Sequence, residues 1–319
     1  MLLMSPYIIT FLVVESLIIF FSFIALFFAF NIVKNYDEKA CVESQFDLAK
    51  KGYLVSTIIF FILAVKIPLF LFFVWAMDTA SAIVPGAMCA AGIVDATEQG
   101  AYMFFLKILN LFLLSGWMLI NHEDAKTKTS IFLKLKFKLF IFLFFFLFAE
   151  FILEFIHFSS IPLDEPVQCC SDIFRQTGLT QMKFWHTNEF ILVVFYTLFV
   201  LLFLSAYYEL DLAIGMLSLS FMLSSIYAII RFFSSYIYEL PVHKCPFCML
   251  QGDYYYIGYV IYILIFVGTL PGFFLFVMDI LDRKVPKFWY RLSLVGNTLL
   301  VAVLTYYPVS YYIRNGVWL

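Results

Sequence analysis

Hydrophobic residues fill eight long segments of the chain, and short polar stretches separate these segments. The segments are expected to cover residues 7–33, 53–76, 102–120, 139–162, 189–208, 212–238, 254–278 and 292–313. Each exceeds the length of about 17 residues that an α-helix needs to cross a hydrocarbon core of about 30 Å. The pattern therefore predicts an all-α polytopic membrane protein with about eight transmembrane helices.

The composition supports this class. The 319 residues are 64% hydrophobic, include 42 Phe, and are only 13% charged. A soluble domain does not carry this much apolar surface, so lipid must cover the outer faces of the helices. The formal net charge of −2 gives no reason to expect a nucleic-acid partner. The lipid bilayer is the expected environment, and the short polar stretches leave no room for a soluble domain.

The Lys and Arg residues are distributed unevenly between the two ends of the expected helices. Of the 20, 13 fall in the loops 34–51, 125–138 and 283–291, on one face of the membrane, and four fall in loops on the other face. Because cytoplasmic loops carry the excess of basic residues, we expect both termini outside. An integral protein of a bacterial inner membrane fits this arrangement.

A Cys-Pro-Phe-Cys motif precedes the seventh hydrophobic segment. Cys245 and Cys248 have the spacing of a redox pair, in which two thiols close a disulfide. We expect them to cap the outer end of the seventh helix, with Pro246 in its first turn. Amide groups at the start of a helix lower the pKa of a thiol, so this position would favour the reactive thiolate. His243 would lower that pKa further or accept a proton.

Five of the six cysteines are expected in outer loops, on the oxidising side of the membrane. These are Cys89, Cys169, Cys170, Cys245 and Cys248, whereas Cys41 is expected in the cytoplasm. Adjacent cysteines form a disulfide with each other only under strain. Cys169 and Cys170 would therefore pair elsewhere, hold one soft metal ion, or exchange disulfides with the Cys-Pro-Phe-Cys pair.

A second interpretation of the thiols is a soft-metal site. Thiolate and thioether sulfur select Cu(I), and Met88 adjoins Cys89 in a loop of small residues. In this interpretation Met88, Cys89 and His243 are metal ligands together with the other outer cysteines.

Several ionisable residues fall inside the hydrophobic segments. Glu150, Glu154 and His157 are spaced four and three residues apart, which places them on one stripe of a helix. Charges in lipid are costly, so these residues are expected to pair inside the bundle with others such as Lys107 and Arg231. They would form structural ion pairs, a proton route, or a polar pocket for a quinone headgroup lined by Arg231, Glu154, His157 and Lys107.

The segments at 139–278 resemble the vitamin K epoxide reductase family and, more loosely, the bacterial membrane oxidases that make disulfides. The similarity lies in the order: a helix, a loop with Cys169-Cys170, two helices, and then Cys245-Pro246-Phe247-Cys248 before the next helix. It covers about half of the chain. The resemblance implies that Cys245 and Cys248 face a quinone, and that Cys169 or Cys170 relays electrons from a partner such as a periplasmic thioredoxin-like protein.

Three functions follow from these patterns. The first is a membrane thiol–disulfide oxidoreductase that exchanges electrons between outer cysteines and a quinone. The second is binding or transport of Cu(I), and the third is a non-catalytic subunit of a larger membrane complex. The expected organisation is an N-terminal part at 1–138 with the Cys89 loop, a thiol-redox bundle at 139–278 and a C-terminal helix at 279–319.

Overall fold

The structure is a computed structural model that describes residues 2–36, 42–126, 132–167, 187–281 and 285–319. Within these ranges the regular structure is helical, with no strand, and eight helices are long and apolar enough to cross a membrane. They are α1 (Pro6–Asn35), α2 (Glu43–Ser81), α4 (Gly100–Lys126), α5 (Leu133–Ser160), α7 (Asn188–Tyr207), α8 with its continuation to α9 (Asp211–Tyr238), α10 (Ile257–Ile280) and α11 (Phe288–Asn315). The predicted fold class is confirmed.

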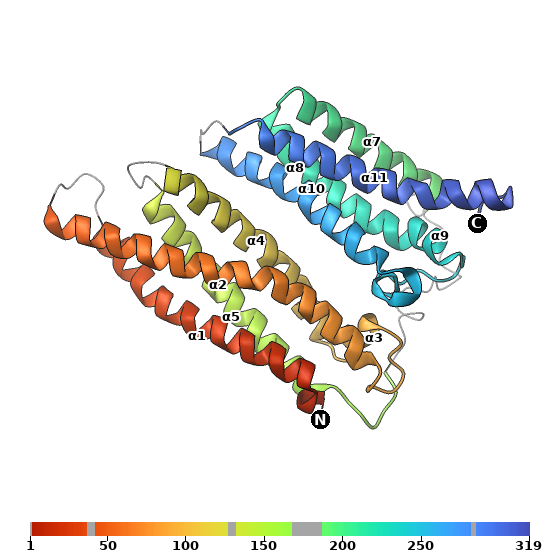
Figure 1. Cartoon of the computed structure of the whole chain (residues 1–319), viewed down its shortest axis with the longest axis horizontal. Coiled ribbons are helices and arrows are strands. Elements are labelled where there is room, and N and C mark those ends of the chain that lie inside the picture. The colour runs from red at the N-terminus through yellow and green to blue at the C-terminus, as the bar shows by residue number, and fades with distance from the viewer. Residues whose placement is uncertain (1, 37–41, 127–131, 168–186, 282–284) are drawn as a thin grey trace. The chain divides into compact units, whose positions relative to one another are not determined.

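The chain divides into two compact units, Met1–Gln168 and Cys169–Leu319. In the first unit α1, α2, α4 and α5 form a closed ring in which each helix packs against two others (Figure 1). In the second unit α7, α8, α10 and α11 form a ring of the same kind. This division differs from the expected boundary at residue 138, because α5 packs along α1 and α4. It differs from the one at residue 278 because α11 packs against α10 and α7.

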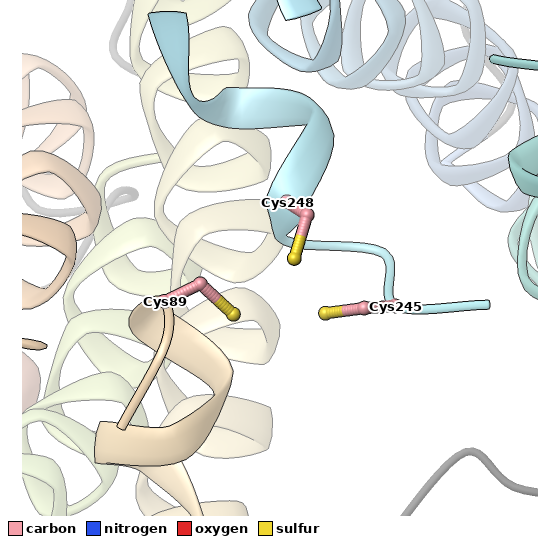
Figure 2. A group of neighbouring side chains, drawn as sticks. All are labelled: Cys89, Cys245 and Cys248. Carbon is pink, nitrogen blue, oxygen red and sulfur yellow. The ribbon is translucent and has the colours of Figure 1, made fainter. Parts of the chain in front are cut away.

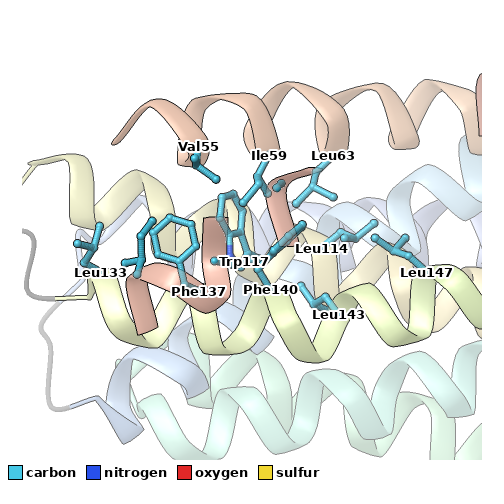
Figure 3. Close-up of a cluster of buried hydrophobic side chains, with 13 residues drawn as sticks. Val55, Ile59, Leu63, Leu114, Trp117, Leu133, Phe137, Phe140, Leu143 and Leu147 are labelled. Atoms are coloured by element: carbon cyan, nitrogen blue, oxygen red, sulfur yellow. The ribbon is translucent and has the colours of Figure 1, made fainter. Parts of the chain in front are cut away.

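The first unit has an apolar core around Trp117, which is fully buried (Figure 3). Val55 and Ile59 of α2 and Phe137 and Phe140 of α5 lie in the same cluster. The indole nitrogen of Trp117 donates a hydrogen bond to the carbonyl of residue 136 at 2.7 Å. Because lipid is as apolar as these side chains, close packing rather than expulsion of water holds the cluster together.

At the opposite end of the first unit, the short helix α3 (Ala90–Val94) packs between α2 and α4. The start of α1 and the end of α5 lie at this end as well (Figure 1). The loop from α3 to α4 therefore lies beside the last turns of α5.

In the second unit, α10 and α11 approach closely through small residues. Gly268 of α10 faces Gly296 and Asn297 of α11, and a Cβ atom on Gly268 would lie 2.4 Å from Asn297 Oδ1. The Gly268 carbonyl accepts hydrogen bonds from Ser293 Oγ at 2.8 Å and Asn297 Nδ2 at 3.0 Å. Small residues and interhelical hydrogen bonds are the usual means by which helices associate in lipid.

Candidate functional site

The Cys-Pro-Phe-Cys motif lies in a loop of the second unit, in which both cysteines are buried and Pro246 and Phe247 are partly buried. Cys248 begins a short 3₁₀ turn (Cys248–Leu250), and Cys245 lies on the segment that leads into it (Figure 2). Cys245 is 2% exposed and Cys248 is 5% exposed, and their Sγ atoms lie within 4.8 Å of each other. The motif therefore brings two sulfur atoms close together in a water-poor environment.

The prediction that this pair caps the seventh helix was wrong. The helix α10 begins at Ile257, nine residues after Cys248. Two 3₁₀ turns intervene, and Tyr255 and Tyr256 have φ values of 54° and 56°, in the left-handed region, which breaks the helical backbone before Ile257. The amide that bonds the pair therefore belongs to the loop and not to the start of α10. The Phe247 N–H donates a hydrogen bond to Cys245 Sγ at 3.4 Å.

Two tyrosines fix the backbone of this loop. The Tyr238 hydroxyl, at the end of α9 (Ser234–Tyr238), donates to the carbonyl of Cys245 and accepts from the Met249 N–H at 2.9 Å. The Tyr262 hydroxyl of α10 donates to the carbonyl of Pro246 at 2.7 Å. Neither tyrosine is predictable from the sequence, because a chain with 20 Tyr offers no signal that marks these two.

Cationic and titratable groups adjoin the loop. The rings of His243 and Tyr238 pack edge to face, with their centroids 4.5 Å apart. The Nε2 atom of His243 is buried without a hydrogen-bond partner among the described residues. Burial, followed by repulsion from the Arg231 guanidinium, lowers the pKa of Lys244. Arg231 lies in a π-helical turn (Ile229–Phe233), a local irregularity that often occurs at functional sites.

The remaining predicted thiol ligands do not belong to this loop. Cys89 is a buried residue of the first unit, immediately before α3, and Met88 beside it is 71% exposed. Cys41, Cys169 and Cys170 lie outside the described residues. The predicted relay through Cys169 or Cys170 and the metal set with Met88, Cys89 and His243 stay predictions.

Among the described residues, the buried charges of the hydrophobic segments gather in the first unit, whereas Arg231 of the second unit is only partly buried. Glu150, Glu154 and His157 of α5 are all fully buried on one stripe of the helix, as the spacing predicted. Lys107 of α4 contacts both glutamates, so the expected pairing inside the bundle is confirmed. The residues proposed for a quinone pocket are therefore divided: three lie in the first unit and Arg231 in the second.

Comparison with known proteins adds no assignment to this site. No family model matches the chain, and no curated protein and no solved structure matches it either.

Proposed function

We propose that this chain is a membrane thiol–disulfide oxidoreductase in which Cys245 and Cys248 exchange two electrons with a quinone. The observation that carries the proposal is the approach of the two sulfur atoms to within 4.8 Å of each other on one buried loop. A structural disulfide would require the same proximity. The surrounding groups favour a reactive pair, because they provide charge stabilisation and a proton acceptor.

The first requirement of thiol chemistry is a thiolate, because the deprotonated sulfur is the nucleophile. The Phe247 amide donates to Cys245 Sγ, and Lys244 adjoins Cys245 in the chain. The amide hydrogen bond stabilises negative charge on that sulfur, and the positive charge of the neighbouring residue acts in the same direction. Cys245 is therefore assigned as the sulfur that becomes anionic first, and Cys248 as its partner.

The two-electron step balances with a quinone as co-substrate. When the Sγ–Sγ bond forms, the two thiols lose two protons and two electrons, and reduction of a quinone to a quinol consumes both. His243 supplies a buried Nε2 atom that accepts one of these protons or donates to a carbonyl oxygen. The guanidinium of Arg231 and the ammonium of Lys244 favour the partial negative charge of that oxygen.

The distribution of basic residues supports a position of the loop on the outer face of the membrane. There a periplasmic thioredoxin-like protein would exchange thiols with the chain, and Cys169 or Cys170 would act as the relay.

The test uses the full chain in lipid nanodiscs, reduced and kept anaerobic. A short-chain quinone is added, thiols are trapped with an alkylating reagent, and the cysteine peptides are quantified by mass spectrometry. Cys245 and Cys248 are expected to lose alkylation together, and Cys245 should stay alkylated in Cys248→Ser. Cys41→Ser is the matched control. The proposal fails when both thiols stay fully alkylatable in the presence of quinone.

Binding of a soft metal ion is the second candidate, and the same sulfur separation favours it. Two metal–sulfur bonds of about 2.3 Å allow sulfur atoms up to about 4.6 Å apart to share one ion, and the two sulfur atoms here lie within 4.8 Å of each other. Metal analysis after anaerobic purification distinguishes the two functions. Copper that is retained by the wild type and lost from Cys245→Ser supports the metal site, and a preparation without bound metal that does not titrate with Cu(I) excludes it.

A further inference from the structure

Five charged side chains meet in the interior of the first unit, one from each of α1, α2 and α4 and two from α5. The Lys107 ammonium nitrogen lies 2.6 Å from Glu150 Oε1 and 3.4 Å from Glu15 Oε1, and it also bonds Glu154 Oε1. The Lys66 ammonium nitrogen lies 2.6 Å and 2.7 Å from the two oxygens of Glu15 and 3.1 Å from Glu150 Oε1. All five side chains are at most 5% exposed.

The cluster has an uneven charge balance, because three carboxylates face two ammonium groups. The formal sum is −1 when every group is ionised, and burying an uncompensated charge in a bundle within lipid is expensive. A metal ion does not fit the three carboxylates, since the ammonium of Lys107 already occupies the point at which they converge. One bound proton neutralises the cluster without displacing any of these groups.

The hydrogen bonds identify which carboxyl group takes that proton. Both oxygens of Glu15 contact Lys66, and the second oxygen of Glu150 accepts from Asn110 Nδ2 at 2.6 Å. The Glu154 Oε1 atom contacts Lys107, but Oε2 is buried without a hydrogen-bond partner among the described residues. A proton on Glu154 Oε2 therefore costs the fewest existing contacts.

Two further polar side chains, His157 and Thr97, lie between this carboxyl group and the loop at the end of the unit. His157 lies three residues after Glu154 on the same stripe of α5 and is fully buried. Its Nδ1 atom lies 2.6 Å from Thr97 Oγ1, and its Nε2 atom has no hydrogen-bond partner in the described part of the chain. Thr97 is partly exposed in the loop between α3 and α4, beside the exposed residue Glu98.

Gly100 makes the close approach of His157 possible. A Cβ atom at this position would lie 1.8 Å from the carbonyl oxygen of Val94 and 2.8 Å from His157 Cε1, so a larger residue would displace both the loop and the ring. The position of the His157 ring therefore depends on the first residue of α4 as well as on α5.

We propose that Glu154 is a proton-binding site inside the first unit, and that the proton reaches it from the loop at Thr97 through His157. The ligand is a single proton. The proposal rests on the first unit alone and goes beyond the thiol chemistry assigned to Cys245 and Cys248. Glu15, Lys66, Lys107 and Glu150 are the charged groups that face the site, with the rings of Phe11 and Phe73 against the Lys107 ammonium.

Infrared difference spectroscopy of the full chain in lipid tests the site directly. A pH step should produce the C=O stretching band of a protonated carboxylic acid, and transfer to heavy water should shift it. Glu154→Gln should abolish this band, and it should fold because it leaves two carboxylates facing two ammonium groups. Glu154→Asp should move the band without removing it, and Glu98→Gln, on the exposed loop, should leave it unchanged. A band that persists unaltered in Glu154→Gln, or no band in the wild type at any pH, overturns the proposal.

The route has its own readout, the rate at which the band shifts after transfer to heavy water. His157→Gln should keep the band and slow its shift by roughly 100-fold, the lower end of the effect of a positioned proton-transfer group. Thr97→Val should slow it in the same direction. An unchanged rate in both variants contradicts the assigned path.

Discussion

The ammonium nitrogen of Lys107 lies 2.6 Å from the Oε1 atom of Glu150, and both side chains are almost completely buried between helices. In lipid such a contact replaces water as the partner of each charge, so neither group has an alternative partner outside the bundle. The contact joins α4 to α5, which places α5 in the first unit.

Removal of Lys107 should strongly destabilise the first unit. Lys107→Met leaves three buried carboxylates with only Lys66, and breaking a buried ion pair costs about 3–5 kcal/mol. We expect a large drop in the midpoint of thermal unfolding in detergent. Lys287→Met provides the control, because its partner Glu209 lies on the surface and such pairs are worth about 0–1 kcal/mol.

The same cluster predicts a compensating change. At high pH, where Glu154 has released its proton, Lys107→Met combined with Glu154→Gln removes one charge of each sign, so at that pH the double variant should be more stable than Lys107→Met alone. Equal unfolding midpoints for the two variants would contradict the charge balance proposed for the cluster.

Tyr238 should control access to Cys245. Tyr238→Phe removes the hydroxyl that bonds the Cys245 carbonyl and the Met249 N–H, which leaves two backbone groups unpaired at a cost of about 1–3 kcal/mol each. The loop should open more often, and the alkylation rate of Cys245 should rise. Tyr255→Phe is the control, because that side chain is 93% exposed. An identical alkylation rate in Tyr238→Phe would mean that the hydroxyl does not hold the loop.

The sequence predicts the eight helices because length and apolarity alone decide whether a segment spans a membrane. The stripe of Glu150, Glu154 and His157 is also predictable, since it follows from helical periodicity. The contacts of Lys107 with these residues are not, because partners on different helices depend on which helices become neighbours.

The residue at which α10 begins could not be predicted from the sequence either. Tyr254, Tyr255 and Tyr256 adjoin an apolar segment and fit an aromatic belt at a membrane boundary, so a helix across them is expected. The left-handed backbone at Tyr255 and Tyr256 has no sequence signal, because Gly rather than Tyr normally occupies such positions. The position of the cysteine pair relative to the helix could therefore not be predicted.

Gly268 should be intolerant of a side chain. In Gly268→Ala the new Cβ atom would lie 2.4 Å from Asn297 Oδ1, which forces α10 and α11 apart and costs about 1–3 kcal/mol. The unfolding midpoint should fall. Ser220→Ala on the exposed face of α8 should leave it nearly unchanged, and an unaltered midpoint in Gly268→Ala would show that the contact is not tight.

Lys244 should make the free energy of unfolding depend on pH in the alkaline range. Its pKa is lowered below 10.5 by burial and by Arg231, so between the lowered value and 10.5 the unfolded chain holds a proton that the folded chain has lost. The free energy of unfolding should rise with pH across this window. Lys244→Gln should reduce that rise, as measured by thermal unfolding at increasing pH. The same slope in both proteins would contradict the shift.

The amount of quinol formed by the reduced protein tests the assigned thiol chemistry most directly. Anaerobic, fully reduced chain in nanodiscs is mixed with excess quinone, and quinol is measured for the wild type and for the Cys245→Ser/Cys248→Ser double variant. We expect the wild type to form one more quinol per chain than the double variant, because closing one disulfide releases two electrons. Equal quinol yields from the two proteins would contradict it.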